Sequence, residues 1–451
     1  MISLEIHFSK FIESLGTVRR IVLAYSGGLD SRVLLQLIVD ARKRLPSLFS
    51  SPVPSLVALH IDHGLQANSA QWAAHCKKSC ESLSVDFHCV ALQLQVPKGE
   101  SVEAAARQAR YAVFRDFLQP EDALLLAHHQ DDQVETLVLQ LLRGAGPHGL
   151  AAMGDAVPFQ AGRMIRPLLD VTRTQIELYA REKQLHWIED PSNASDAFDR
   201  NYLRHQVMPL LEKRWPSYRK TIARAACHQQ QTAKLLDEVA ALDWQQSAST
   251  EKNQLSMDWL TSLSLTRQQN LLRYWIRFNG FITPNQKQLM QILSMTRLIG
   301  EDHQPIVAWD AVEVRGYQRR LYLLPVCELS APQTILWKDR QKPLKTGIAT
   351  HHLLLRACVG AGIAQHWLEA SDHQVEVGYR AGGERCRFAG KSFSTSVKKY
   401  FQQQKIPPWE RERIPLLWID GKLAAIVGYE YCEFFVAKEQ EPGYELVLEI
   451  N

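Results

Sequence analysis

The short segment Ser26–Ser31, which reads SGGLDS, constrains the fold of this chain more than any other feature. It follows an apolar, strand-like run at residues 20–25 and precedes an amphipathic helical pattern that starts near residue 30. A strand, a glycine-rich turn and a helix start together form a cradle for phosphate, because backbone N–H groups and the positive helix end point at the anion. The segment therefore predicts a nucleotide site in an α/β domain.

The residue types in this loop suit ATP. Glycines at positions 27 and 28 let the backbone approach the phosphates closely, the serine hydroxyls can donate hydrogen bonds, and Asp30 can hold the Mg²⁺ that accompanies ATP. The loop lacks the Gly-Lys-Ser/Thr ending of P-loops that transfer the γ-phosphate. The alternative is a plain Gly-Gly turn before a capped helix. The ATP-binding residues predicted here are Ser26, Gly27, Gly28, Leu29, Asp30 and Ser31.

Strand-like and helical patterns alternate through the first half of the chain. This alternation predicts a doubly wound parallel sheet of the α/β class, in which ligands bind at the carboxyl ends of the strands. Each candidate motif below follows an expected strand. The expected strands cover 21–25, 55–62, 86–92 and 123–127, and the expected helices cover 30–44, 70–83, 102–118 and 131–143. Beyond this alternation, a further helix is expected over 201–211.

The length of 451 residues exceeds what a single core supports, so several domains are expected. Two smaller domains should follow the α/β domain, the middle one largely helical and the last one α+β. The predicted divisions are 1–216 for the ATP-binding catalytic domain, 217–245 for a helical connector, 246–331 for the middle substrate- or tRNA-binding domain, 332–370 for a linker and 371–451 for a C-terminal tRNA-binding domain.

Composition excludes some classes of protein and favours others. No apolar run reaches the length of a membrane span and the N-terminus lacks a signal-peptide pattern, so a cytoplasmic protein is expected. The eight cysteines include no Cys-x-x-Cys pair, which disfavours zinc and iron–sulfur sites. The net charge is only +4, yet the window 380–413 holds nine basic and three acidic residues. Such a window is either a solvated face or a phosphate-binding surface.

Two weaker motifs follow the second and third expected strands. His60 and Asp62 end the second strand within the run His60–Leu65, where they could reach the adenosine of ATP or simply cap the strand. Arg107 and Arg110 lie three residues apart on one helical face. They could stabilise the charge that develops on a phosphate, or form ordinary surface pairs with acids.

A stronger motif follows the fourth strand. In His128–Thr136 two histidines end the strand and acidic residues open the next helix. Asp132 and Glu135 share one helical face, so the pair could bind an amine or a metal ion. Acids that complement the helix dipole are the alternative. Farther along, Arg200 and Arg204 lie one helical turn apart and could contact RNA phosphate or pair on the helix surface.

The loop resembles the SGGxDS loop of the PP-loop ATP-pyrophosphatases, and the motifs taken together closely resemble the tRNA(Ile)-lysidine synthase family. The resemblance covers most of the chain, but over residues 217–370 it rests on the general arrangement of the chain and not on matching motifs. A glutamine at position 66, where many relatives carry a basic residue, is one departure. The matching segments are Ser26–Ser31, His60–Leu65, Glu103–Tyr111, His128–Thr136, Arg143–Gly149, Asp190–Arg204, Tyr379–Arg385, Ile406–Arg411 and Ile414–Leu417.

The resemblance implies a two-step ligase reaction. ATP and Mg²⁺ would adenylate the wobble cytidine of a CAU-anticodon tRNA(Ile), and free L-lysine would then displace AMP. The implied catalytic residues are Asp30, His128, Asp132, Glu135, Arg107 and Arg110, with Asp132 and Glu135 holding lysine. The implied tRNA contacts are Arg200, Arg204, Arg380, Arg385, Lys398 and Lys399. Base stacking by Tyr400, Phe401 and Trp409 is less expected than a place in the core.

Two alternatives remain at this point. One is a PP-loop tRNA thiolase, which the cysteine spacing disfavours. The other is a nucleotide-gated RNA-binding protein without turnover, which would leave the full set of candidate catalytic residues unexplained. The sequence leaves the oligomeric state open, a homodimer included.

Overall fold

The computed structural model describes residues 4–13, 15–16, 18–44, 53–62, 64, 68–92, 96, 102–247, 249, 251–297, 305–326, 334–346 and 351–450. Contacts between residues divide the chain into two compact units, Met1–Leu242 and Asp243–Asn451. Among the described helices, none combines the length and apolar character needed to cross a membrane. Two residues of the run His60–Leu65, His63 and Leu65, lie outside the described residues.

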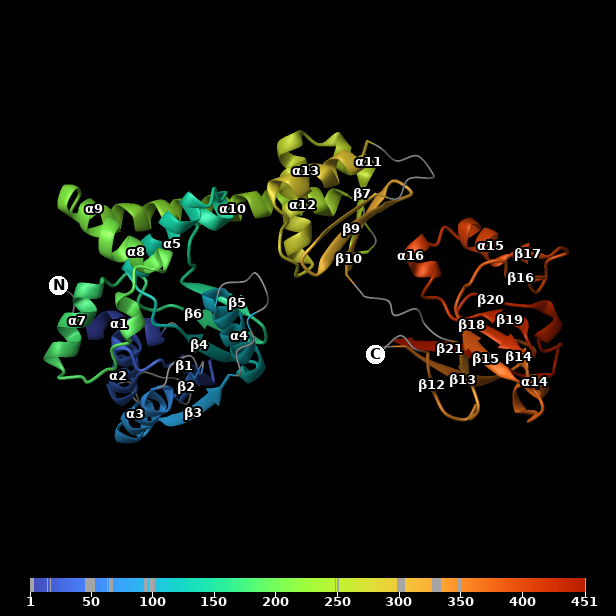
Figure 1. Cartoon of the computed structure of the whole chain (residues 1–451), viewed down its shortest axis with the longest axis horizontal. Helices are drawn as coiled ribbons and strands as arrows, with labels where there is room; N and C mark the ends of the chain where they lie inside the picture. The colour runs from blue at the N-terminus through green and yellow to red at the C-terminus, as the bar shows by residue number, and fades with distance from the viewer. Residues whose placement is uncertain are drawn as a thin grey trace. The chain divides into compact units, whose positions relative to one another are not determined.

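A six-stranded sheet forms the centre of the first unit (Figure 1). The strand order is β3-β2-β1-β4-β6-β5, in which every neighbouring pair is parallel except β5 with β6. This arrangement confirms the predicted α/β class with a parallel sheet. The strands are β1 (Arg20–Ala24), β2 (Ser55–Asp62), β3 (Asp86–Ala91), β4 (Asp122–Leu125), β5 (Ala156–Phe159) and β6 (Gly162–Ile165).

Helices cover both faces of this sheet because β1 and its neighbours are apolar on both sides. On β1, Ile21 and Leu23 pack into the larger core cluster, whereas Val22 packs with Phe114 of α4 in a second cluster. The helices of the larger cluster are α1 (Leu4–Glu13), α2 (Leu29–Arg44), α3 (Ser69–Ser82) and α7 (Arg173–Glu182), and α4 (Val102–Phe117) covers the other face.

The sheet order places two motifs side by side. The chain leaves β1 toward β2 on one side and returns to β4 on the other side, so the order reverses between β1 and β4. Open α/β sheets bind ligands at this switch point, outside the carboxyl ends of the strands. The loop Ser26–Ser31 follows β1, and the run His128–Thr136 follows β4 and opens α5 (Gln130–Leu142).

Beyond the sheet, the first unit is helical. A single helix was expected over 201–211, but the chain forms α8 (Asp199–Tyr202), a π-helical turn η2 (Leu203–Val207) and α9 (Met208–Arg214). Pro209 accounts for the wide turn, because proline has no N–H to donate to the carbonyl of residue 205. The remaining helices are α6 (Pro147–Leu150), the 3₁₀ turn η1 (Pro191–Ala194) and α10 (Tyr218–Gln246).

The second unit starts with a small antiparallel sheet and three helices around their own core, in which Trp275 is fully buried. The strand order is β7-β10-β9-β8. Its elements are β7 (Gln254–Ser256), α11 (Met257–Ser262), α12 (Leu265–Phe278), α13 (Gln286–Met295), β8 (Ile306–Trp309), β9 (Val312–Tyr317) and β10 (Arg320–Pro325).

The last part of the second unit combines two larger antiparallel sheets, ordered β11-β15-β18-β19-β20 and β12-β13-β21-β14, with the short pair β16-β17. Its strands are β11 (Ile335–Leu336), β12 (Leu344–Lys345), β13 (His351–Val359), β14 (Ile363–Ala364), β15 (Val375–Gly378), β16 (Arg385–Cys386), β17 (Thr395–Ser396), β18 (Leu416–Ile419), β19 (Lys422–Ile426), β20 (Glu430–Tyr431) and β21 (Pro442–Ile450). Its helices are α14 (Gln365–Glu369), α15 (Val397–Gln403), α16 (Pro408–Arg411) and the 3₁₀ turn η3 (Glu433–Phe435).

The stretch 332–370, expected to be a linker, contributes strands and core residues to this part where it is described. Trp337 and Leu353 are buried in the same cluster as Phe401 and Leu417. β13 pairs with β21 over nine residue pairs that run from His351–Ile450 to Val359–Pro442. These contacts join segments far apart in the sequence, so they leave no local signal.

Candidate active site

The glycine-rich loop is held in the shape of a cradle. The Ser26 and Ser31 hydroxyls lie 3.1 Å apart, and the Ser31 hydroxyl donates to the Gly28 carbonyl at 3.0 Å. Gly27 has φ +83°, and a Cβ at this position would lie 2.5 Å from Cys76 Sγ, so only glycine fits. The backbone N–H of Ile188 donates to the Gly27 carbonyl at 2.9 Å and ties the loop down. The shape of the cradle is therefore fixed by contacts within the loop and with Ile188.

His60 and Asp62 support the edge of this site through local hydrogen bonds. His60 is buried and its Nδ1 lies 2.9 Å from the Tyr25 carbonyl, next to the start of the loop. The Asp62 carboxylate accepts from the Gly64 N–H at 2.9 Å and so shapes the turn after β2. In this structure both side chains engage the backbone that flanks the predicted adenosine site.

Asp30 lies where the loop, α5 and α7 meet. Arg173 Nη1 donates to both Asp30 oxygens at 2.7 Å, and His129 Nε2 is 3.8 Å from the same carboxylate. Burial raises the pKa of Asp30, although the charges of His129 and Arg173 oppose that rise. The motifs after β1 and β4 are thus joined through this one carboxylate.

Asp132 and Glu135 face the same partners, as their spacing predicts. Arg200 donates to Glu135 at 2.7 Å and to Asp132 at 2.9 Å, and Arg204 makes two bonds to Glu135 at 2.8 and 2.9 Å. Glu135 is 1% exposed and Asp132 is 8% exposed. Burial would raise the pKa of Asp132, but the charges of His129 and Arg200 outweigh it and lower the pKa to about 2. Both arginines predicted to contact tRNA therefore neutralise the acids predicted to hold lysine.

Arg107 and Arg110 form a second group of cations, and neither makes an ion pair with an acid whose side chain the structure describes. Arg107 and Tyr111 on α4 make a cation–π contact, with the guanidinium 5.0 Å from the ring centre. The buried Nε of Arg110 has no hydrogen-bond partner among the described residues. Burial lowers the pKa of Arg110, and the neighbouring Arg107 and Arg200 lower it further. The buried Nε of Arg110, with the exposed Arg107 beside it, therefore forms a site suited to an anion.

Two arginines at this site were not singled out from the sequence. Arg173 begins α7 and binds Asp30, and Arg166 follows β6 and donates from Nε to His128 Nδ1 at 3.3 Å. Because β6 runs parallel to β4, its carboxyl end faces the same edge of the sheet. The rule that ligands bind at the carboxyl ends of strands would have pointed to Arg166, but a β6 strand was not expected.

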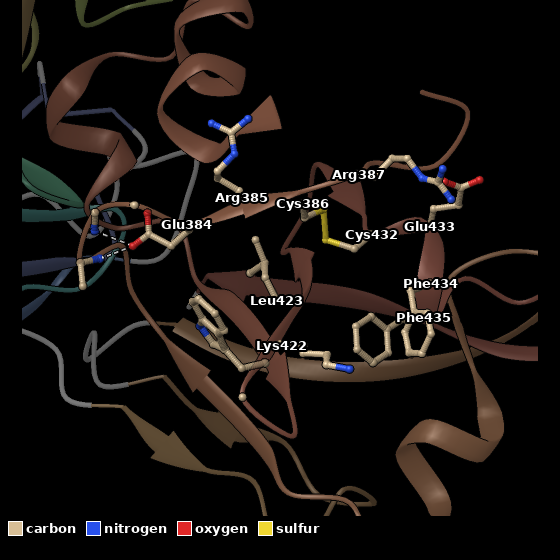
Figure 2. Close-up of a pocket in the computed structure, with 15 residues that line it drawn as sticks. Glu384, Arg385, Cys386, Arg387, Lys422, Leu423, Cys432, Glu433, Phe434 and Phe435 are labelled. Carbon is tan, nitrogen blue, oxygen red and sulfur yellow. Dashed lines mark hydrogen bonds and ion pairs between the residues drawn. A yellow bond between two sulfur atoms is a disulfide. The ribbon is translucent and has the colours of Figure 1, made fainter. Parts of the chain in front are cut away.

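Arg385, one of the predicted tRNA contacts of the C-terminal part, lines an open pocket of about 700 Å³ (Figure 2). Its cationic lining consists of Arg385, Arg387 and Lys422, and Lys422 Nζ lies 5.4 Å from the centre of the 65% exposed Phe434 ring. A disulfide between Cys386 and Cys432 forms part of the wall.

The other predicted tRNA contacts of this part do not line the pocket. Lys398 and Lys399 are exposed, and Arg380 is half-buried with its Nε 3.9 Å from Glu384. The aromatic residues Tyr400, Phe401 and Trp409 are buried, which confirms their expected place in the core.

Three family models match this chain in order. A PP-loop domain matches residues 2–211, a TilS substrate binding domain matches 255–322, and a TilS substrate C-terminal domain matches 375–448. These matches together span both compact units.

Curated relatives match over nearly the whole length. The tRNA(Ile)-lysidine synthase of Coxiella burnetii is 39% identical over 439 residues, covering 97% of this chain and 95% of its own length. Those of Legionella pneumophila (strain Lens) and Alkalilimnicola ehrlichii are 36% and 38% identical and cover 97% and 98% of this chain, and 97% and 96% of their own lengths.

Two solved structures show weaker similarity. The U34-tRNA thiolase NcsA from Methanococcus maripaludis is 19% identical with a TM-score of 0.40, covering 50% of this chain and 77% of its own. A TILS C-terminal domain is 17% identical with a TM-score of 0.22, covering 26% of this chain and 98% of its own.

Proposed function

Because this chain belongs to the tRNA(Ile)-lysidine synthase family, we propose that it joins free L-lysine to C2 of the wobble cytidine in a CAU-anticodon tRNA(Ile). The reaction consumes ATP and releases pyrophosphate and AMP. The observation that carries the proposal is the meeting of three features at one edge of the sheet: the phosphate cradle, the unpaired cations and the paired acids.

The first half of the reaction activates the cytidine. Its C2 oxygen attacks the α-phosphorus of ATP, and pyrophosphate leaves as the P–O bond breaks. The loop Ser26–Ser31 binds the departing phosphates, and Arg107, Arg110 and His128 lie beside the α-phosphate, where negative charge develops. The buried Nε of Arg110, which has no hydrogen-bond partner among the described residues, supports this assignment, since an anion would supply one.

The residues around Asp30 fit a magnesium–ATP complex. Mg²⁺ takes oxygen ligands and usually combines one or two carboxylates with phosphate oxygens and water. Asp30 and the hydroxyls of Ser26 and Ser31 supply such oxygens on one side of the cradle. Bound there, Mg²⁺ would neutralise phosphate charge. Arg173 occupies the Asp30 oxygens in this structure, so metal binding requires this ion pair to open.

The second half of the reaction forms the C–N bond. The ε-amine of lysine attacks C2 and loses a proton, and AMP leaves with the C2 oxygen. Asp132 and Glu135 hold the lysine by charge. The low pKa of Asp132 suits it to binding an ammonium group rather than to removing a proton. Lysine must compete with Arg200 and Arg204, which already bind these acids.

A Glu135→Gln variant tests the amine site. Because the charge of Glu135 would attract lysine but not ATP, we expect the KM for lysine to rise at least tenfold while the KM for ATP changes less than twofold. Steady-state AMP release measures both constants. An exposed acid on another face, changed as Glu182→Gln, is the control. Equal changes in both KM values would show that Glu135 does not bind lysine.

The basic window contacts tRNA phosphates in this proposal. Lys398 and Lys399 are exposed on α15, and the pocket beside the disulfide adds Arg385 and an exposed aromatic ring, Phe434. Exposed cations next to an aromatic face suit a nucleic acid. We place the reaction in the cytoplasm, where tRNA, ATP and free lysine are available.

Nucleoside analysis tests the whole proposal. The protein is incubated with ATP, lysine and a CAU-anticodon tRNA(Ile), and the digested tRNA is examined for lysidine. We expect lysidine and AMP in equal amounts, and neither when lysine or the tRNA is omitted. Pyrophosphate without any modified nucleoside would contradict the ligase. Sulfur in the product would favour the thiolase, and ATP-stimulated tRNA binding without pyrophosphate would favour the non-catalytic alternative.

A further inference from the structure

Arg166 is a buried arginine that points its donors at groups without negative charge. Nη1 donates to the Gly154 carbonyl at 2.7 Å, Nη2 to Met164 Sδ at 3.0 Å, and Nε to His128 Nδ1 at 3.3 Å. It is 8% exposed, and the neighbouring Asp155 and Tyr111 also favour its charged form. Of the three hydrogen bonds above, the one to His128 reaches a candidate catalytic residue.

This contact determines where His128 carries its proton. An arginine is always a donor, because guanidinium does not lose its proton in proteins. His128 Nδ1 must therefore accept with its lone pair, which leaves the single proton of the neutral ring on Nε2. Nε2 itself has no hydrogen-bond partner among the described residues, so it is available to donate to a ligand.

Three arginines around His128 also favour a neutral ring. Arg166 after β6, Arg110 on α4 and Arg200 on α8 all disfavour a cationic ring, and Asp132 on α5 is the acid that opposes them. Burial is the largest cause and, together with these arginines, it lowers the pKa of His128 to about 3. A ring that stays neutral at physiological pH and accepts at Nδ1 is a fixed hydrogen-bond donor at Nε2.

We propose that Arg166 is a positioning residue that holds His128 in the Nε2–H form, so that His128 donates to the phosphate under attack and does not act as a general base. The role at the phosphate rests on the proposed function, whereas the tautomer rests on the structure alone. His128 then joins Arg107 and Arg110 as a third donor beside the developing charge, and it brings no net charge that would oppose release of the product.

NMR of the full-length protein labelled with ¹⁵N-histidine tests the tautomer without any activity. We expect the His128 signals, assigned by their loss in His128→Gln, to show a protonated Nε2 and an unprotonated Nδ1 from pH 5.5 to 8. A proton on Nδ1, or titration near the ordinary histidine pKa, would overturn the proposal. Because the parent protein gives this answer, it holds even if a variant folds poorly.

Variants of Arg166 test the effect on the reaction. In Arg166→Met, burial, Arg110 and Arg200 still disfavour a cationic ring, so His128 should stay neutral. Without a donor at Nδ1, the neutral ring becomes a mixture of the two tautomers, and Nε2 carries the proton only part of the time. We therefore expect the rate of pyrophosphate release to fall several-fold relative to the parent, equally at pH 6 and at pH 8, with the KM for ATP changed less than threefold.

Two further variants complete the experiment. Arg166→Lys keeps a cationic donor and should restore the Nε2–H signal and part of the rate. Arg163→Gln removes another β6 arginine, which bonds the Leu15 carbonyl away from His128, and should match the parent. A relative rate that rises with pH in Arg166→Met would identify His128 as a base and overturn the proposal. If no lysidine forms but the tautomer is as expected, only the proposed function fails.

Discussion

At the scale of single residues, Asp30 connects the two motifs that follow β1 and β4. Its carboxylate binds Arg173 and faces His129, and its pKa is raised by burial. Asp30 is the candidate metal-binding carboxylate of the cradle, and it has no proposed role in binding tRNA. Its removal should therefore slow the reaction without weakening tRNA binding.

We expect Asp30→Ala to lower pyrophosphate release by about 100-fold or more, the scale of losing one charge-stabilising group, with tRNA affinity unchanged within twofold. Pyrophosphate release and filter binding of tRNA measure the two effects. Asp116→Ala, an exposed acid on α4, is the matched control. Loss of tRNA binding in parallel with activity would mean that Asp30 supports the fold rather than the reaction.

Local patterns predicted some of these residues and not others. Ser26–Ser31 and His128–Thr136 are continuous in sequence, so the chemistry of each motif is visible in a short segment. Arg173 is 143 residues from Asp30, and the contact between them depends on how α7 packs beside the loop. Arg200 and Arg204 were recognised as one pair and Asp132 and Glu135 as another, but the contact between the two pairs was not predicted. A residue's type suggests its chemistry, whereas its partner depends on the tertiary fold.

At the scale of elements, strands and helices with strong periodicity were predicted well, and elements that depend on distant contacts were not. The alternation in the first half gave the sheet its correct class because each buried strand is a short apolar run. β11 and β13 were not expected, since their partners β15 and β21 lie up to about 100 residues away. The π-turn before Pro209 also departed from the simple helical pattern over 201–211.

That π-turn carries Arg204, whose contacts with Glu135 should hold α5 and the 199–214 segment together. Arg204→Ala removes two hydrogen bonds to the Glu135 carboxylate but leaves that carboxylate paired with Arg200, so we expect it to destabilise the first unit by about 1.5 kcal/mol. Amide hydrogen exchange in α5 of the full-length protein measures this change. Arg214→Ala, an exposed arginine of α9, should change it by less than about 0.5 kcal/mol. Unchanged protection in Arg204→Ala would show that the acids are held by other contacts.

At the scale of the whole molecule, the two units carry different parts of the proposed reaction. Every candidate catalytic residue lies in the first unit, and the basic window lies in the second. A single exposed cytidine offers few contacts, so selection of one tRNA requires contacts elsewhere on the RNA. The second unit is where loss of charge should weaken binding without changing the chemical step.

The exposed pair Lys398 and Lys399 tests this division. Each cation that neutralises a phosphate releases counterions, so tRNA affinity falls with salt in proportion to the number of such contacts. In Lys398→Gln/Lys399→Gln we expect tRNA affinity to drop several-fold at low salt and the slope of log affinity against log salt to shrink by about one to two. At saturating tRNA, the rate of AMP release should match that of the parent. Lys77→Gln/Lys78→Gln, an exposed lysine pair on α3, makes the same change of charge in the first unit and should leave the slope unchanged. If the slope of log affinity against log salt is the same for both double variants and the parent, the basic window does not contact tRNA phosphates.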